Sequence, residues 1–410
     1  MDVDHIPFAR PGNRGAAAPA QQSVSDPALE LLALVATESA VSRAELARVL
    51  KVAPSTVSLR VNELLSAGLL VETGDGNSTG GRKPRSLQLN HSAGHVLVAD
   101  LGAHHVRVGV MDLSGALLAS DAIELDVAQG PEKSLATIAG LFDELAAGIS
   151  SSTLRGVGIA LPGPVDYDAG CVDSPARMPG WHRFPIRDWL AGHYNVPVFC
   201  DNDANMMALA EHTLRQTSAE HGKKPRNTLF IKAGAAIGCG LIADGLVYRG
   251  STGTAGDITH VRVRAAGDRA CSCGNLGCLE TVASGSAIVA DLVAAGIDVA
   301  DLSAVVELAN NADAVATTQI RGAGRLLGEM LCSIVNFVNP DYVVLGGALA
   351  QVEPYVAAIR SQLYEGCHPL ATKNLTIEKS LAGPHAGMIG IGVLSLREVL
   401  RTSTLVPSGI

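Results

Sequence analysis

The chain has 410 residues, which predicts two or three domains with a sizeable core. Hydrophobic residues make up 47% of it and aromatic residues only 3%, a composition typical of packed α/β layers. No stretch approaches twenty uninterrupted apolar residues, so the sequence excludes a membrane-spanning helix. The formal net charge of -9 does not by itself suggest a nucleic-acid partner.

The N-terminal residues 1–25 are rich in Pro, Gly and Ala and lack the apolar core that a signal peptide needs. We expect them to form a disordered arm. Without a signal peptide the chain is expected to be cytoplasmic, with no membrane partner. Because cysteines stay reduced in that compartment, the eight cysteines favour metal ligation over disulfides.

Positive charge gathers near the N-terminus. Residues 42–90 hold seven Lys and Arg against four Asp and Glu, a net +3, which leaves -12 for the rest of the chain. A modestly basic module on an acidic body is compatible with DNA binding.

The pattern over residues 26–90 predicts a winged helix-turn-helix domain. Three helices are expected, at 27–40, 42–50 and 55–67. Ser42 and Glu45 fit a capping box, Pro54 suits a helix start, and Gly68 suits a helix end. The third helix turns small polar side chains and an arginine outward at its N-terminal end, which is the layout of a recognition helix.

Two short strands at 69–72 and 86–89 enclose a flexible, basic loop that predicts the wing. Its cations can lie on phosphates or enter a minor groove. The residues expected to contact operator DNA are Ser55, Thr56, Ser58, Arg60, Arg82, Lys83 and Arg85. The alternative is a small helical protein–protein module. Helices and wing in the right order favour DNA, and modest affinity per copy favours a homodimer or homotetramer.

From His95 the pattern changes to apolar strands alternating with helices. Strands are expected at 96–101, 106–112, 116–123, 156–161, 196–200, 228–232, 238–242 and 341–345; helices at 132–149, from about 203 to 211, and at 314–338, 353–363 and 388–401. Two such units with Gly turns near a central cleft predict a duplicated α/β fold that closes over a ligand.

Polar residues follow the strand at 196–200 directly, in the run Asp201-Asn202-Asp203-Ala204-Asn205. Ligands in α/β sheets bind at the carboxyl ends of strands, so Asn202 and Asp203 are well placed for chemistry. The alternative is helix capping by Asp and Asn.

A metal site is predicted in the stretch 256–280. His260, Cys271, Cys273 and Cys278 form a complete tetrahedral ligand set for structural Zn²⁺. The alternative is core cysteines beside an unrelated histidine. The other five cysteines lie scattered in apolar surroundings, as core thiols do, and this contrast favours the metal.

Residues 96 to about 400 resemble the ROK family of sugar kinases and sugar-responsive repressors. The resemblance is carried by LPGPVD at 161–166, MPGW at 178–181, DNDAN at 201–205, GDITH at 256–260, CSCGNLGCLE at 271–280 and LGG at 345–347. With its winged helix, the whole chain is similar to the xylose and N-acetylglucosamine repressor branch. The resemblance implies an actin/hexokinase-like α/β body over 91–410. Its lobes are expected at about 91–210 plus the C-terminal helix, and at 211–400.

The same resemblance implies roles for individual residues. The position of Asp203 is that of the general base in the family's kinases. Asn202, Asp203, His260 and Glu280 are expected to bind sugar hydroxyls, and Asp257 takes the place of a sugar-binding Glu that is one methylene longer. Zinc on His260 would fix its ring and thereby the nitrogen that faces the sugar.

The departures from the kinase pattern lie where ATP phosphates would bind. The kinase motif D-x-G-G-T reads Asp100-Leu101-Gly102-Ala103-His104, and G-T-G-x-G reads Gly234-Ala235-Ala236-Ile237-Gly238. Phosphate binding needs accessible backbone N–H groups, which the added side chains obstruct. We therefore expect a regulator, most simply a repressor, with a sugar effector, a vestigial base at Asp203 and no catalytic residue. The alternatives are an active sugar kinase with an accessory DNA-binding domain, and a regulator whose body binds no sugar and answers to a protein partner.

Overall fold

The computed structural model describes residues 31–32, 34–35, 41–66, 68–73, 85–149, 154–217 and 224–401. The predicted arm at 1–25 and most of the first predicted helix lie outside these residues, as do Arg82 and Lys83 of the wing. In the described part of the chain, no helix is long and apolar enough to cross a membrane.

The N-terminal unit is a helix-turn-helix followed by a hairpin. Helices α2 (Arg43–Leu50) and α3 (Pro54–Ser66) precede strands β1 (Leu70–Thr73) and β2 (Ser86–Leu89), which pair antiparallel with Leu70 opposite Leu89. The capping box of Ser42 and Glu45 is present. Gly68 follows α3 with a φ of +72°, a conformation that favours glycine. This order of elements confirms the predicted fold of the unit.

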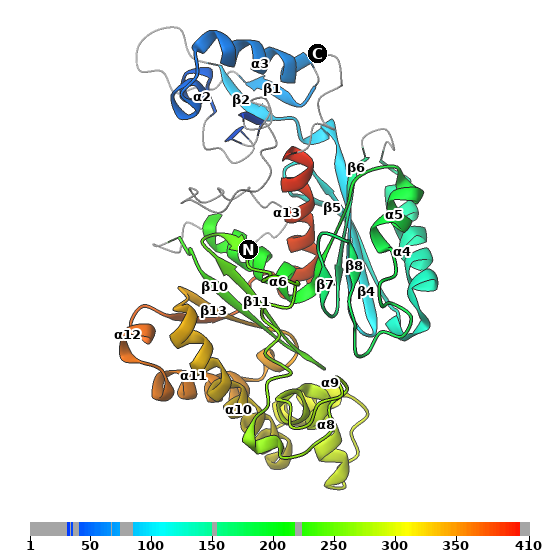
Figure 1. Cartoon of the computed structure of the whole chain (residues 1–410), viewed down its shortest axis with the longest axis vertical. Coiled ribbons are helices and arrows are strands. Elements are labelled where there is room, and N and C mark those ends of the chain that lie inside the picture. Colours follow the sequence, from blue (N-terminus) through cyan, green and yellow to red (C-terminus); the bar gives the residue numbers. More distant parts are fainter. Residues whose placement is uncertain are drawn as a thin grey trace.

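The first sheet of the body has the strand order β5-β4-β3-β6-β9. Its strands are β3 (His95–Leu101), β4 (His105–Asp112), β5 (Leu117–Glu124), β6 (Leu154–Leu161) and β9 (Val198–Asn202). Helices α4 (Pro131–Ala146) and α5 (Ile186–Tyr194) cover one face, and α13 (Ala386–Arg401) lies against the other (Figure 1). The short hairpin β7 (Val165–Asp166) and β8 (Cys171–Val172) stands between β6 and α5 in the sequence.

The second sheet has the order β12-β11-β10-β13-β14. Its strands are β10 (Thr228–Ala233), β11 (Ile237–Ala243), β12 (Leu246–Val247), β13 (Tyr342–Gly346) and β14 (Thr376–Lys379). Its helices are α7 (Glu280–Ala283), α8 (Gly285–Ala294), α9 (Leu302–Asn310), α10 (Ala314–Val338), α11 (Glu353–Gly366) and α12 (Pro369–Thr372). Helices α8 to α11 share a core with this sheet. Two five-stranded sheets with helical layers agree with the predicted duplicated α/β body.

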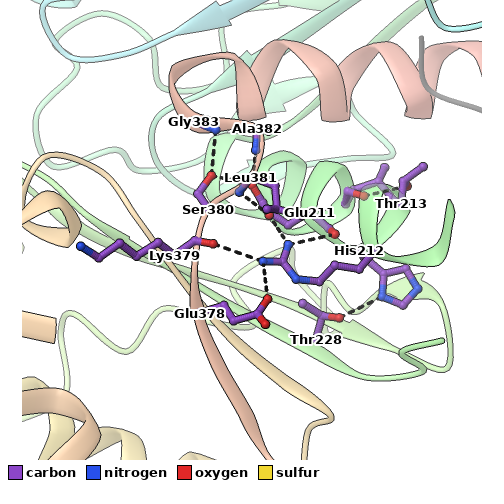
Figure 2. Close-up of polar contacts among 12 residues, drawn as sticks. Glu211, His212, Thr213, Thr228, Glu378, Lys379, Ser380, Leu381, Ala382 and Gly383 are labelled. Carbon is purple, nitrogen blue, oxygen red and sulfur yellow. Dashed lines mark hydrogen bonds and ion pairs between the residues drawn. The ribbon is translucent and has the colours of Figure 1, made fainter. Parts of the chain in front are cut away.

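Two segments connect the sheets. Helix α6 (Asp203–Thr217) runs from β9 to β10, and the chain returns from β14 to α13. The sequence placed the end of α6 near Glu211, a charged residue, but the helix continues to Thr217. Glu211 is buried within the helix, where its carboxylate has hydrogen-bond partners. It accepts from the Ser380 hydroxyl at 2.5 Å and from the Ala382 N–H at 2.9 Å (Figure 2).

The winged helix packs on the body through apolar side chains. Leu87 and Leu89 of β2 and Val399 and Leu400 of α13 belong to one continuous cluster of buried side chains that also includes residues of α6. The Arg155 guanidinium adds a hydrogen bond of 2.9 Å to the carbonyl of Ala93 in the connection between the two units. Figure 1 shows the winged helix at one end of α13. The winged helix and the two segments that join the sheets therefore share one core.

Candidate functional site

The polar run after β9 is held at the start of α6. The Asn202 amide donates to the Gly163 carbonyl at 2.9 Å, and its carbonyl oxygen accepts from the Asn205 N–H at 3.1 Å. Helix capping, the alternative weighed for this cluster, is therefore present. Asp203 is buried beside it. Capping holds the Asn202 side chain, whereas the Asp203 carboxylate is directed toward the second sheet, where it has a charged partner.

That partner is Lys232 on β10, which forms an ion pair with the Asp203 carboxylate. Burial lowers the pKa of Lys232, but attraction by Asp203, Asp100 and Glu280 outweighs burial, so its pKa is raised. Lys232 was not among the residues predicted from the sequence. A lysine inside the apolar strand Thr228–Ala233 was the available signal, because lysine is seldom buried without a charged partner.

Asp100, at the end of β3, lies close enough to this pair to interact with it electrostatically. Burial raises the pKa of Asp100 to about 6, and the Asp203 charge adds to the effect. One of its carboxylate oxygens has no hydrogen-bond partner among the described residues. Gly387 at the start of α13 leaves room for it, since a Cβ there would lie 2.4 Å from the carboxylate carbon.

In the turns at 100–104 and 234–238, the chain's own groups lie against the backbone. The His105 ring packs on Gly102, where a Cβ would meet the ring at 2.4 Å, and burial lowers the pKa of His105 to about 4. In the second turn, the carbonyls of Gly234 and Ala235 accept from the N–H groups of Gly285 and Ser286 at 2.9 and 3.0 Å. These carbonyls face the start of α8, where a phosphate would require donors.

The structure brings together the four predicted metal ligands. The ligand atoms of His260, Cys271, Cys273 and Cys278 all lie within 4.8 Å of one another. The sulfurs of Cys273 and Cys278 are 3.7 Å apart, and the Nδ1 atom of His260 is 3.4 Å from the Cys271 sulfur. A tetrahedral ion with Zn–S bonds of about 2.3 Å places its sulfurs about 3.8 Å apart. The cluster has the size that zinc requires.

Charge supports the same fit. Burial and the neighbouring thiols raise the pKa of Cys278 to about 12. Burial opposes ionisation of Cys273 too, but hydrogen bonds from Asn275 and from the neighbouring thiols outweigh it and lower the pKa of Cys273. A divalent cation would stabilise the thiolates. Gly274 and Gly277 have φ values of +90° and +79°, and a Cβ on Gly277 would lie 2.6 Å from the Gly267 carbonyl. The tight turns around the cluster therefore depend on glycine.

Glu280 lies between the four predicted metal ligands and the first unit of the body. Its buried carboxylate accepts from the Ile237 N–H at 3.2 Å and from the Thr259 hydroxyl, so one oxygen is fixed within the second unit. The other oxygen pairs at 3.1 Å with Arg177, which comes from the loop between β8 and α5 of the first unit. The Arg177 side chain also donates to the Ser272 hydroxyl at 3.3 Å. Arg177 thus bridges the two units.

A cavity of about 410 Å³ lies beside this bridge, lined by Arg177, Cys271, Ser272, Glu280 and Ser284 among others. Asp257 is exposed and follows a close approach of the backbone: Gly256 has a φ of +92°, and a Cβ there would lie 2.2 Å from the Cys239 carbonyl. Sequence reasoning missed Arg177. Its position before Met178-Pro179-Gly180-Trp181 was the only local signal.

On the winged helix, Ser55 and Thr56 are exposed at the start of α3, whereas Ser58 and Arg60 are half-buried. Arg60 pairs with Glu63 at 2.8 Å, and Arg85 pairs with Glu72 at 2.7 Å. Arg43 reaches the same Glu72 at 2.8 Å. The first turn of α3 is therefore open to a partner, while the charges of Arg60 and Arg85 are partly balanced within the unit.

Comparison with known proteins gives a consistent result. Residues 96–398 match the model of the family described as the ROK family. The chain is 27% identical over 388 residues to the xylose repressor of Caldicellulosiruptor bescii, covering 91% of this chain and 96% of that one. It is 28% identical over 381 residues to the DNA-binding transcriptional dual regulator NagC of Escherichia coli K12, covering 88% and 89%.

Two solved structures differ in how much of this chain they match. A ROK family transcriptional regulator, a homolog of the E. coli MLC protein, superposes with a TM-score of 0.76 at 26% identity over 92% of this chain and 96% of its own. A ROK hexokinase from Thermus thermophilus superposes with a TM-score of 0.61 at 30% identity, covering 74% of this chain and 99% of its own. The hexokinase thus matches about three quarters of the chain, and the regulator matches nearly all of it.

Proposed function

Because the chain belongs to the ROK family, we propose that it is a DNA-binding transcriptional repressor whose kinase-like body binds a sugar as its effector. The observation that carries the proposal is the extent of the match. Two relatives named as regulators and a solved regulator correspond to this chain over 88–92% of its length, against 74% for the hexokinase.

In this proposal the effector lies between the two sheets. Asn202, Asp203, Asp257, His260 and Glu280 bind its hydroxyl groups, carried over from the family pattern. The geometry supports these roles in part, since Asp203 and Glu280 are buried acceptors at the cleft and Glu280 borders the cavity. Asp257, shorter than the family's Glu, is the residue that we expect to alter which sugar fits.

Zinc is the proposed structural cofactor, held by His260, Cys271, Cys273 and Cys278. The ion would stabilise the thiolates and hold this stretch of chain in shape. The Nδ1 atom of His260 faces the cysteines, which leaves the Nε2 atom for the ligand. Arg177, which touches both Ser272 and Glu280, would carry a change in the cleft to the metal stretch.

DNA binding is assigned to residues 26–90, with Ser55, Thr56, Ser58, Arg60, Arg82, Lys83 and Arg85 at the operator. A homodimer would place two such units on one operator. The ligand reduces DNA affinity only if it binds better to the arrangement of units that does not bind DNA. The shared core of the winged helix, α6 and α13 is the physical connection through which closing the cleft would act.

An active sugar kinase is the second candidate, because the hexokinase match includes nearly all of that enzyme. Against it stand the ion pair that engages Asp203 and the two turns that the chain's own groups occupy. ATP turnover measured with a sugar panel separates the two. Sustained sugar-dependent ADP release would overturn the regulator proposal, and its absence together with operator binding supports it.

The direct test begins by selecting genomic fragments on the purified protein. Recovery of a few discrete sites near sugar-utilisation genes, released by one sugar, is the expected result. Uniform recovery of all fragments at physiological salt would contradict sequence-specific regulation.

A further inference from the structure

We propose that Leu59 in α3 recognises a thymine of the operator by contact with its 5-methyl group, and so determines one base of each half-site. This inference rests on the proposed DNA-binding function and names a residue through which that function becomes sequence-specific. It depends on the exposure of α3, on the charges around it and on the chemistry of the base edges.

Leu59 lies on the exposed side of α3. Val57, Val61 and Leu64 of the same helix are at most 1% exposed and fill the core of the winged helix, whereas Leu59 is 58% exposed. The fold of the unit therefore does not require an apolar residue at position 59. A leucine that stays in water gains free energy only when a partner covers it.

The side of α3 around Leu59 carries no charge. Residues three or four positions apart are neighbours on a helix surface, so Ser55 and Thr56 lie one turn before Leu59 and Asn62 lies one turn after it. All four side chains are exposed. The Asn62 amide oxygen accepts from the Arg43 guanidinium at 2.9 Å. A partner that meets this side of the helix therefore contacts Leu59 between small polar groups.

The cations of this unit lie beside that surface. Arg60 is half-buried and paired with Glu63 at 2.8 Å within α3. Arg48 in the last turn of α2 and Lys51 in the turn before α3 are exposed. Phosphate contacts position a protein on DNA, whereas base contacts specify the sequence. Cations that flank a neutral surface therefore fit a unit that rests on phosphates and recognises bases without charge.

The chemistry of the major groove identifies the base. The N-terminal residues of a recognition helix approach the base edges there. Arg and Lys recognise guanine and Asn or Gln recognise adenine, whereas apolar side chains contact the 5-methyl group of thymine. The Ser55 and Thr56 hydroxyls are compatible with more than one base. Leu59 has no hydrogen-bonding group in its side chain, so the methyl group of thymine is the feature that it can distinguish.

A protein partner is the alternative occupant of this side of α3. The centre of a protein–protein interface is depleted of charge and enriched in aromatic side chains. Here a single leucine stands among Ser55, Thr56 and Asn62, with cations beside it. One apolar contact within a polar, positively flanked surface fits a methyl group in the major groove better than it fits a protein.

The test uses the full-length protein and an operator fragment selected from genomic DNA. Each thymine in turn is replaced by uracil, which keeps the base pair and its hydrogen-bonding groups and removes only the 5-methyl group. The dissociation constant is measured at fixed salt. We expect one position in each half-site at which the replacement raises this constant about fourfold, the contribution of one buried methyl group.

Two variants connect this effect to Leu59. Leu59→Ala should bind the thymine and uracil operators equally, since the side chain that contacts the methyl group is removed, and its melting temperature should match that of the parent protein. Leu118→Ala is the matched control, because Leu118 in β5 is 53% exposed and belongs to the body. This control should keep the preference for thymine.

Three results would overturn the inference while leaving the regulator function in place. The first is an operator affinity that no uracil replacement changes, and the second is a thymine preference that persists in Leu59→Ala. The third is an unaltered operator affinity of Leu59→Ala, which would assign Leu59 to a protein partner. If no discrete fragment is selected at all, the DNA-binding proposal fails together with this inference.

Discussion

Asp100 is an aspartate whose carboxylate the fold buries. The His105 ring packs on Gly102 in the turn after β3, and Gly387 at the start of α13 lies against the Asp100 carboxylate. Among the described residues, one oxygen of this carboxylate has no hydrogen-bond partner. Its charge therefore costs folding free energy.

This cost predicts a pH dependence. Because the pKa of Asp100 is raised from its unfolded value to about 6, ionisation opposes folding. The penalty is absent below the unfolded pKa of about 3.9, grows through the interval between the two values, and is complete above about pH 6. Asp100→Asn should then gain stability relative to the parent protein by about 1–3 kcal/mol on going from pH 4.5 to pH 7.5. Denaturant unfolding at both pH values measures this; a constant difference would mean that Asp100 does not titrate in this interval.

The cluster of His260, Cys271, Cys273 and Cys278 gives a second prediction at this scale. Cys273→Ser should remove zinc, because a serine hydroxyl is a poor replacement for a thiolate ligand. We expect about one zinc per chain in the parent protein and almost none in the variant by elemental analysis, with a lower melting temperature. Cys239→Ser, a buried cysteine outside the cluster, is the control that should retain zinc. Equal metal content in parent and Cys273→Ser would refute the site.

At the scale of elements, helix α6 is tied to the returning chain by a buried charge network. The Arg215 guanidinium forms an ion pair with Glu211 and donates to the Lys379 carbonyl at 3.2 Å, and Glu211 holds residues 380–382 (Figure 2). Both charged side chains are fully buried. The network joins the two segments that connect the sheets.

Removal of one partner should therefore be costly. Glu211→Gln removes the nearer of the two carboxylates that pair with the buried Arg215 guanidinium and leaves only Glu378, at 3.3 Å. We expect a loss of about 3–5 kcal/mol in the free energy of unfolding. Glu353→Gln, at an exposed pair, should lose less than about 1 kcal/mol. Equal effects in the two variants, measured by urea unfolding, would show that the network does not stabilise this junction.

The wing yields a prediction that concerns DNA alone. Arg82→Ala should weaken operator binding and reduce its salt dependence, since one cation is lost from the phosphate or minor-groove contacts. Its melting temperature should match that of the parent protein. A clear loss of thermal stability with unchanged DNA affinity would contradict the proposal that Arg82 contacts DNA.

At the scale of the whole molecule, the elements that could be predicted from the sequence are those that depend on neighbouring residues. The helix at 314–338 was predicted with its observed bounds, since its apolar period and the Asn339-Pro340 break are both local features. The hairpin strand at 86–89 and the clustering of the four metal ligands also agree with expectation. Short spacing and turn residues were sufficient in these cases.

What the sequence did not reveal depends on contacts between distant residues. Strand β14 has only four residues and exists because it pairs parallel to β13. The extension of α6 depends on partners about 170 positions away. The ion pairs of Arg177 with Glu280 and of Lys232 with Asp203 form only when the two units of the body come together. A single charged residue in a strand or loop does not identify its partner.

The winged helix, α6 and α13 share one apolar core, so we propose that sugar binding between the two sheets lowers DNA affinity. The most direct measurement is the dissociation constant of a selected operator fragment at fixed salt, with and without each sugar of a panel that includes glucose, xylose and N-acetylglucosamine. We predict that one of these sugars raises this constant at least tenfold. An operator affinity that no sugar changes, although a sugar binds the protein, would contradict it.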